Sequence, residues 1–176
     1  MQASISRGAL SHLRVLDLSR VFAGPWASQM LADLGADVIK VENPNGGDDT
    51  RAWGPPFVEG DATGFIALNR GKKSITCNLA DKAERDALIE RIGAADIFVH
   101  NLRADVPAKF GIDGPTLTRK FPKLIYADLG AFGHEGPWKE RPGYEPIIQA
   151  VAGLISLNGD PSGPEARVGV SIIDLS

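Results

Sequence analysis

The sequence of 176 residues predicts one α/β domain, residues 1–176, built around a doubly wound and mostly parallel sheet. Two observations favour this fold class. Short runs rich in apolar and β-branched residues recur along the chain, and segments with apolar residues at helical spacing separate them. The first strand, helix and strand follow one another closely, which predicts a parallel pair with a right-handed crossover.

The first strand–helix–strand unit sets the pattern. Arg14–Leu18 and Asp37–Val41 are predicted strands, and Pro25–Leu34 is the helix between them. Pro25 suits a first helical turn, and Gly35 suits a left-handed C-terminal stop. We therefore expect these three elements to form the centre of the fold.

The alternation continues to the end of the chain. Further strands are predicted at Ser74–Leu79, Asp96–His100, Leu124–Leu129 and Arg167–Ile173. Further helices are predicted at Asp81–Ile92, with Asp81 as N-cap and Glu84 completing a capping box, and at Val106–Phe110, Thr116–Lys120 and Tyr144–Ile155. The long segments Pro44–Thr63 and Gly130–Gly143 are predicted loops of a length typical of functional or mobile segments. In such sheets, ligands bind outside the carboxyl ends of the strands.

Composition excludes several classes of protein. The formal net charge of −3 gives no electrostatic case for nucleic-acid binding. The single cysteine, Cys77, cannot form an intramolecular disulfide and favours a reducing cytoplasm. No apolar run approaches the roughly 18 residues of a membrane span, and the polar segment Met1–Gly8 lacks the apolar stretch of a signal peptide. We therefore expect a cytoplasmic protein with no membrane partner.

Several familiar motifs are absent or incomplete. Glu42 ends the second strand where a ribose-binding acid would lie, but the first turn, Arg20–Pro25, has one glycine where a dinucleotide fingerprint needs three. Gly71–Ser74 lacks the earlier glycine of a phosphate loop. Ser171 lacks the second glycine of a nucleophile elbow. None of these motifs predicts a site.

The remaining reactive side chains favour structural roles. His12, His100 and His134 are far apart in the sequence and show no ligand spacing with cysteine or carboxylate. Cys77 lies in a predicted apolar strand and is interpreted as a small core residue. We predict no metal site.

Five segments, in order and with matching spacing, resemble the class III CoA-transferases, the formyl-CoA and carnitine CoA-transferase (CaiB/BaiF) group. They are Arg14–Pro25, Leu34–Glu42 followed by Gly47–Arg51, Asn69–Ile75, Ala95–Asn101, and Gly143–Glu145 followed by Gln149. The resemblance runs from about Leu10 to the last residue. It implies a Rossmann-like large domain, an acyl-CoA transferase with no tightly bound cofactor, acyl-CoA and a free carboxylic acid as substrates, and an interlocked homodimer.

The resemblance implies that Asp174 is the nucleophile, which would attack the thioester and form an aspartyl anhydride. Taken by itself, an aspartate at this junction would more simply cap a following helix, and it could do both. The CoA and substrate contacts implied by position, or for the basic side chains by charge, are Phe22, Ala23, Asn43, Lys72, Lys73, Cys77, Asn78, Leu79, Asn101, Leu102, Arg103, Lys109, Tyr144 and Glu145. The alternative for each lysine is a solvated surface residue.

Three positions depart from the family's patterns. Phe22 stands where formyl-CoA transferase has a glutamine, which puts oxalate or formate chemistry in doubt. Asn43 stands where that enzyme has a basic CoA contact. Tyr144 stands where the related α-methylacyl-CoA racemases have a histidine, so a two-base proton exchange loses one partner and transfer is favoured over racemisation.

Family members are longer than this chain, which ends two residues after Asp174. We therefore expect a fragment that lacks the small domain and is itself inactive. A truncated, non-catalytic CoA-binding module is the alternative to an enzyme.

Overall fold

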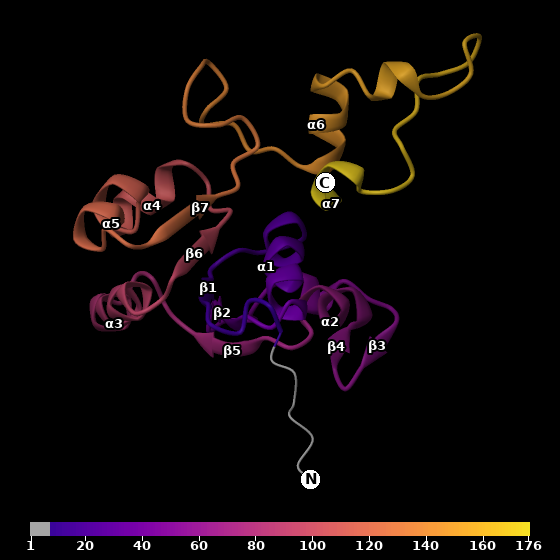
Figure 1. Ribbon diagram of the computed structural model, residues 1–176. Coiled ribbons are helices and arrows are strands. Elements are labelled where there is room, and N and C mark those ends of the chain that lie inside the picture. Colours follow the sequence, from indigo (N-terminus) through magenta and orange to yellow (C-terminus); the bar gives the residue numbers. More distant parts are fainter. Residues whose placement is uncertain (1–7) are drawn as a thin grey trace. The chain divides into compact units, whose positions relative to one another are not determined.

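The computed structural model describes residues 8–176 (Figure 1). These form two compact units, one ending at Leu129 and the other spanning Gly130–Ser176.

The first unit is built on a five-stranded sheet with the order β5-β2-β1-β6-β7, in which every neighbouring pair is parallel. The strands are β1 (Arg14–Asp17), β2 (Asp37–Glu42), β5 (Lys73–Thr76), β6 (Ile97–His100) and β7 (Ile125–Asp128). The chain adds strands on one side of β1 and then returns to its other side. The predicted parallel α/β sheet is therefore confirmed.

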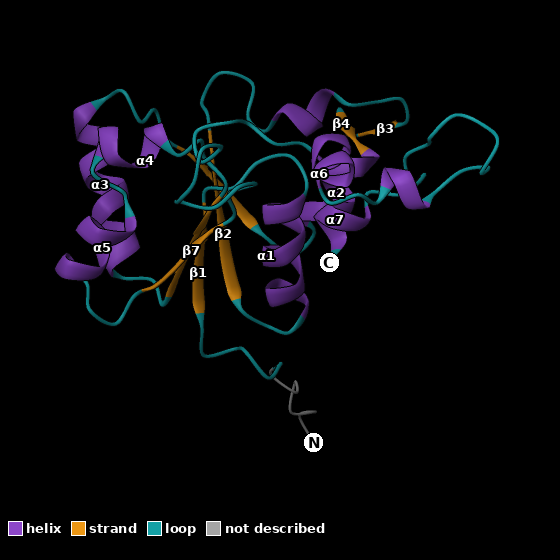
Figure 2. Ribbon diagram, turned by 90° about the horizontal axis from the view of Figure 1, so that it is seen from above, coloured by secondary structure: helices purple, strands orange, loops and turns teal. Residues whose placement is uncertain are grey.

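Helices lie on both faces of this sheet, as a doubly wound fold requires. They are α1 (Ala23–Asp33), α2 (Thr63–Asn69), α3 (Lys82–Gly93), α4 (Asp105–Phe110) and α5 (Gly114–Lys120). Figure 2 shows α3, α4 and α5 on one side of the sheet and α1 on the other. Helix α2 packs against α1.

The two faces of the sheet bury alternate residues of the same strands. Leu16 and Phe98 pack with Leu88 of α3 on one face, whereas Val15 and Val99 belong to the cluster that includes α1 side chains on the other. Successive side chains of a strand point to opposite faces, so strands buried on both faces need continuous apolar runs. This explains why the predicted strands are mainly apolar at successive positions.

The segment predicted as the long loop Pro44–Thr63 contains regular structure. A 3₁₀ helix η1 (Asp49–Ala52) precedes a two-residue hairpin of β3 (Phe57–Val58) and β4 (Asp61–Ala62), and α2 begins at Thr63. Elements this short leave no periodic apolar pattern in the sequence. The prediction of a loop over the whole of Pro44–Thr63 was therefore wrong.

Strand β5 is shorter than predicted and ends at Thr76, so Cys77 follows the strand, although it is buried as expected. Helix α3 begins as predicted, because the Asp81 carboxylate accepts hydrogen bonds from the backbone N–H groups of Ala83 and Glu84. The predicted capping box is not formed, because the N–H of Asp81 donates to the Asn78 carbonyl at 3.0 Å. The Glu84 carboxylate instead accepts the N–H of Asn78 at 2.7 Å and holds the loop that leads into the helix.

The second unit contains α6 (Glu145–Val151), a 3₁₀ helix η2 (Ile155–Leu157) and α7 (Ile172–Leu175). The predicted helix Tyr144–Ile155 is therefore shorter, ending ahead of Gly153 at φ 79°. The predicted strand Arg167–Ile173 is wrong, because that segment ends in α7. A strand needs a ladder partner, and this unit pairs Gly159 with Glu165 as an isolated bridge, without a sheet.

No helix within residues 8–176 is long and apolar enough to cross a membrane. The same residues contain no group of three or more histidine, cysteine, aspartate or glutamate side chains arranged to hold a metal ion.

Candidate functional site

The strand order creates a topological switch point between β1 and β6. From β1 the chain proceeds to β2 and β5 on one side, and then to β6 and β7 on the other. In open α/β sheets, ligands bind in the crevice outside the carboxyl ends of the strands at this point. The segments that leave β1 and β6 here are the first turn, defined as Leu18–Phe22, and the segment Asn101–Arg103.

Asn101 joins these two segments directly. Its side-chain oxygen accepts the N–H of Arg20 at 2.8 Å, and its side-chain nitrogen donates to the carbonyl of Arg20 at 2.6 Å. The structure thus brings Phe22 at the end of the first turn and Ala23 at the start of α1 close to the residues that follow β6. These sequence-predicted contacts lie at the same edge of the sheet.

Helix α1 starts at this crevice with Phe22 as its N-cap, and no side chain caps it. The first N–H groups of a helix have no partner within the helix, and the N-terminus carries partial positive charge. Such an end suits an anionic or carbonyl oxygen. The geometry therefore fits the predicted contacts at Phe22 and Ala23.

The backbone of the first turn is strained and tightly packed. Val21 has φ 70°, which is an outlier for a β-branched residue, and its N–H points to the Asp48 carboxylate at 3.3 Å. At Gly24, an added Cβ would lie 2.3 Å from the Cβ of Ser19. Only glycine allows this approach of α1 to the first turn.

We predict that Gly24→Ala lowers the free energy of unfolding by about 1–3 kcal/mol, because the methyl group forces the turn and helix apart. Gly64→Ala in α2 is the matched control, since its Cβ would meet nothing within 4 Å. It should instead stabilise the protein by about 0.5–1 kcal/mol. Urea unfolding of the two variants measures the difference, and effects of the same sign would contradict the packing argument.

A network of buried polar and charged side chains holds the first turn in place. Asp17, at the end of β1, is fully buried and accepts hydrogen bonds from the N–H of Ser19 at 2.8 Å and from the hydroxyl of Ser28 at 2.5 Å. Lys40 of β2 is also buried, and its ammonium binds Asp48 at 2.8 Å and the carbonyl of Ser19 at 2.9 Å. These contacts hold the turn at several successive positions.

Lys72, predicted as a phosphate partner, belongs to this network. Its side chain is 1% exposed, and its ammonium lies within 3.2 Å of oxygens of Asp17, Pro25, Ser28 and Asn69. Burial lowers the pKa of Lys72 to about 8, although the Asp17 carboxylate acts in the opposite direction. An ammonium enclosed in this way cannot reach a ligand phosphate, so Lys72 is reassigned to the support of the turn.

Lys73 also departs from the prediction. Its exposed ammonium pairs with Asp37 at 2.7 Å, and Asp37 begins β2 at the amino end of that strand. The side chain therefore points away from the edge at which ligands bind. Its exposed position fits the alternative of a solvated surface lysine.

The other predicted contacts of the first unit lie in or near segments that follow strands. Asn43 is exposed directly after β2, and Cys77–Leu79 follow β5. Burial raises the pKa of the Cys77 thiol, which fits a packing role. Arg103 is exposed and paired with Asp105 at 2.8 Å, while Lys109 is exposed on α4.

Glu42 ends β2 in a polar cluster. Burial would raise its pKa, but hydrogen bonds from Arg51, Ser74 and the N–H of Asp48 outweigh burial and lower the pKa to about 2. Arg51 also binds Asp61 at 2.8 Å and stacks on the Phe65 ring at 3.8 Å. This cluster, like the network at Lys72, ties the segment of residues 47–65 to the sheet.

His100, interpreted as structural from the sequence, is fully buried at the end of β6. Its Nε2 lies 2.5 Å from the Tyr126 hydroxyl, and its Nδ1 accepts the N–H of Leu102 at 3.3 Å. The ring thereby fixes the start of the segment Asn101–Arg103.

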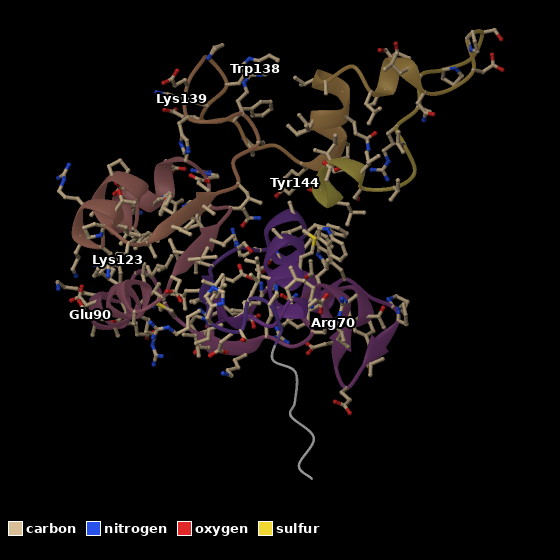
Figure 3. The ribbon with its side chains drawn as sticks, viewed as in Figure 1. Arg70, Glu90, Lys123, Trp138, Lys139 and Tyr144 are labelled. Carbon is tan, nitrogen blue, oxygen red and sulfur yellow. The ribbon has the colours of Figure 1, made fainter. Side chains whose placement is uncertain are left out.

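In the second unit, Asp174 lies in α7 and not directly after a strand. Glu145 of α6 accepts the backbone N–H groups of Ile173 and Asp174 at 3.2 and 2.8 Å. Burial and the charge of Glu145 both raise the pKa of the Asp174 carboxyl. Tyr144 is 64% exposed immediately before α6. Figure 3 shows its labelled side chain beside α6.

Sequence reasoning missed the buried polar residues that hold the first turn: Asp17, Ser19, Ser28, Lys40 and Asp48. A signal was present, because Asp17 and Lys40 interrupt apolar strand runs, and charged residues in buried strands need partners. The partners could not be identified from spacing.

The sheet order and its helices define a doubly wound α/β protein. Comparison with known proteins gives its family. The model of CoA-transferase family III matches residues 10–176. The chain belongs to this family, as the motifs predicted.

Curated relatives include the succinate–glutarate CoA-transferase of Agrobacterium fabrum, 49% identical over 94% of this chain and 43% of the relative. They also include the mouse succinyl-CoA:glutarate CoA-transferase, 41% identical over 95% of this chain and 38% of the relative. The chain thus spans about two fifths of their length. A crystal structure of a CaiB/BaiF family protein from Brucella suis has a TM-score of 0.91 and 43% identity, over 96% of this chain and 46% of that one.

Proposed function

We propose that the protein containing this chain transfers CoA between an acyl-CoA and a free carboxylic acid, with Asp174 as the nucleophile and no tightly bound cofactor. Membership in CoA-transferase family III is the observation that carries the proposal. The proposal extends to an interlocked homodimer in the cytoplasm, as the family resemblance implies.

The crevice of the first unit supports CoA binding. It offers the uncapped N-terminus of α1 and the segment Asn101–Arg103, held in place by the two hydrogen bonds between Asn101 and Arg20. The phosphates of CoA are anions, which suit the N–H groups of a helix start. Arg103 is exposed at the surface, where it pairs with Asp105 and can turn to a phosphate. Lys72 and Lys73 are left out of the proposed contacts.

The chemistry of Asp174 needs no proton transfer. An ionised Oδ of Asp174 attacks the thioester carbon, and the carbon–sulfur bond breaks. CoA leaves as the thiolate, and an acyl-aspartyl anhydride is formed on the protein. The thiolate then attacks the Asp174 carboxyl carbon, which gives an aspartyl-CoA thioester and releases the donor acid. The acceptor acid repeats the two steps in reverse order and restores the carboxylate. A carboxylate with a raised pKa is a stronger nucleophile while it remains ionised.

Hydroxylamine trapping tests this proposal on the whole protein. With succinyl-CoA as donor and glutarate as acceptor, chosen from the names of the relatives, hydroxylamine should convert Asp174 to a hydroxamate that peptide mass spectrometry can locate. Asp174→Ala should give no hydroxamate and should lower kcat by at least about 10³-fold, since the covalent route is lost.

Asp160→Ala is the matched control, because this aspartate lies in the same unit and is exposed. It should keep both the hydroxamate and the transfer rate. CoA transfer by Asp174→Ala at the wild-type rate would contradict the covalent mechanism. Tight CoA binding without any exchange of labelled acid would instead favour a non-catalytic CoA-binding module.

A further inference from the structure

We infer that Glu145 is a positioning residue, which holds the backbone of α7 and thereby orients the Asp174 carboxylate, and is not a contact to substrate. The inference rests on the proposed role of Asp174 and deepens it. All the contacts that carry it lie within the second unit.

Both oxygens of the Glu145 carboxylate are engaged with this chain. Oε2 accepts the N–H of Asp174 at 2.8 Å, and Oε1 accepts the N–H of Ile173 at 3.2 Å. These N–H groups belong to the first turn of α7, where a helix has no internal acceptors for them. A carboxylate placed there acts as the cap that α7 otherwise lacks, since Ser171 makes no side-chain cap.

Gln149 extends the same support one helical turn further along α6. Its Nε2 donates to Glu145 Oε1 at 2.6 Å, and its Oε1 accepts the N–H of Val168 at 2.9 Å. Residues four apart on a helix share a face, so the two side chains hold the segment 168–174 at both ends. Gln149 is 1% exposed and Glu145 8% exposed, which leaves little of either side chain for a ligand.

The arrangement has an electrostatic consequence for Asp174. Glu145 places a negative charge next to it, and together with burial this raises the pKa of the Asp174 carboxyl. Gln149 and the N–H groups keep Glu145 itself ionised, because hydrogen bonds to the carboxylate, together with Arg167, outweigh burial and lower the pKa of Glu145. Asp174 is thus held in position by a group that also makes it more basic.

Glu145→Gln in the whole protein tests the inference. The amide has one acceptor oxygen where the carboxylate has two, so α7 loses one anchor while the side-chain volume is kept. We expect kcat to fall by about 10²-fold, the scale of a misplaced reacting group, with KM for succinyl-CoA unchanged. The acidic limb of the kcat/KM profile should also move to lower pH, because the neighbouring charge is gone.

Two further variants separate positioning from other roles. Gln149→Leu should lower kcat and move the acidic limb less than Glu145→Gln does, because it removes an anchor but leaves the Glu145 carboxylate in place. Glu140→Gln, at an exposed glutamate of the same unit, should change neither quantity. If Glu145→Gln does not fold, Gln149→Leu decides, and unchanged kcat in that variant overturns the inference.

A rise in KM with unchanged kcat in Glu145→Gln would show a substrate contact and overturn the inference. An acidic limb of the kcat/KM profile that does not move in Glu145→Gln would overturn the inference as well. Failure of the underlying function has a different signature, since wild-type protein would then give no hydroxamate at Asp174.

Discussion

Lys72→Met is expected to lower the free energy of unfolding by about 3–5 kcal/mol, because it leaves the buried carboxylate of Asp17 without its cation. Asp17 is fully buried, so water cannot solvate the carboxylate that is left unpaired. The other donors to Asp17 are neutral groups of Ser19 and Ser28, which cannot balance a negative charge. Urea unfolding at pH 7 measures the loss.

The adjacent lysine provides the control for this prediction. Lys73 forms a shorter ion pair with Asp37, at 2.7 Å against 3.2 Å for Lys72 and Asp17, but both of its side chains are exposed, at 69% and 46%. Lys73→Met should therefore cost no more than about 1 kcal/mol. Adding Asp17→Asn to Lys72→Met should recover part of the stability by removing the unpaired charge. Equal losses for the two lysine variants would contradict the assignment of Lys72 to the buried network.

The second large effect is acid destabilisation through Glu42. Its pKa is about 2 in the folded protein against an ordinary value of 4.5, so the unfolded chain binds more protons between these values. The contribution to stability is then fully present above about pH 4.5 and is lost as pH falls through about 2. A shift of this size corresponds to about 3 kcal/mol, and the Glu42 side chain is 3% exposed, so solvent screens it little.

The comparison of wild type with Glu42→Gln isolates this effect. The stability difference between them should shrink by about 3 kcal/mol from pH 6 to pH 2. Arg51→Met offers a second check, because it removes the hydrogen bonds and charge of Arg51 that lower the pKa of Glu42, so this pKa rises. That variant should lose stability at a higher pH than wild type. If the stability difference between wild type and Arg51→Met does not change with pH, the role given to Arg51 is contradicted.

Sequence periodicity predicted the sheet and its main helices because their physical cause is local. The apolar runs at Arg14–Leu18 and Asp96–His100 are needed for strands buried on both faces, and Asp81 caps its helix through contacts two and three residues away. The order of motifs also predicted the family, which the match over residues 10–176 confirms. The assignment of individual residues to CoA contacts stays a prediction.

The predictions that failed depended on partners distant in the sequence. Arg167–Ile173 has the composition of a strand, but it has no strand to pair with, and Glu145 instead caps a helix at its end. Lys72 and Lys73 are neighbours of the same type, yet one ammonium is enclosed by Asp17 and the other is solvated. A sequence gives the charge of a side chain but not its surroundings.

The sequence alone therefore determined the alternation of strands and helices, the family and the identity of the candidate nucleophile. Tertiary structure alone decided which charges are buried, which groups they pair with, and what holds Asp174 in place. The physical reason is one of range: strand and helix patterns and caps arise from contacts within a few residues. The pairs Lys72–Asp17 and Glu145–Asp174 are separated by 55 and 29 residues and meet only when the chain has folded.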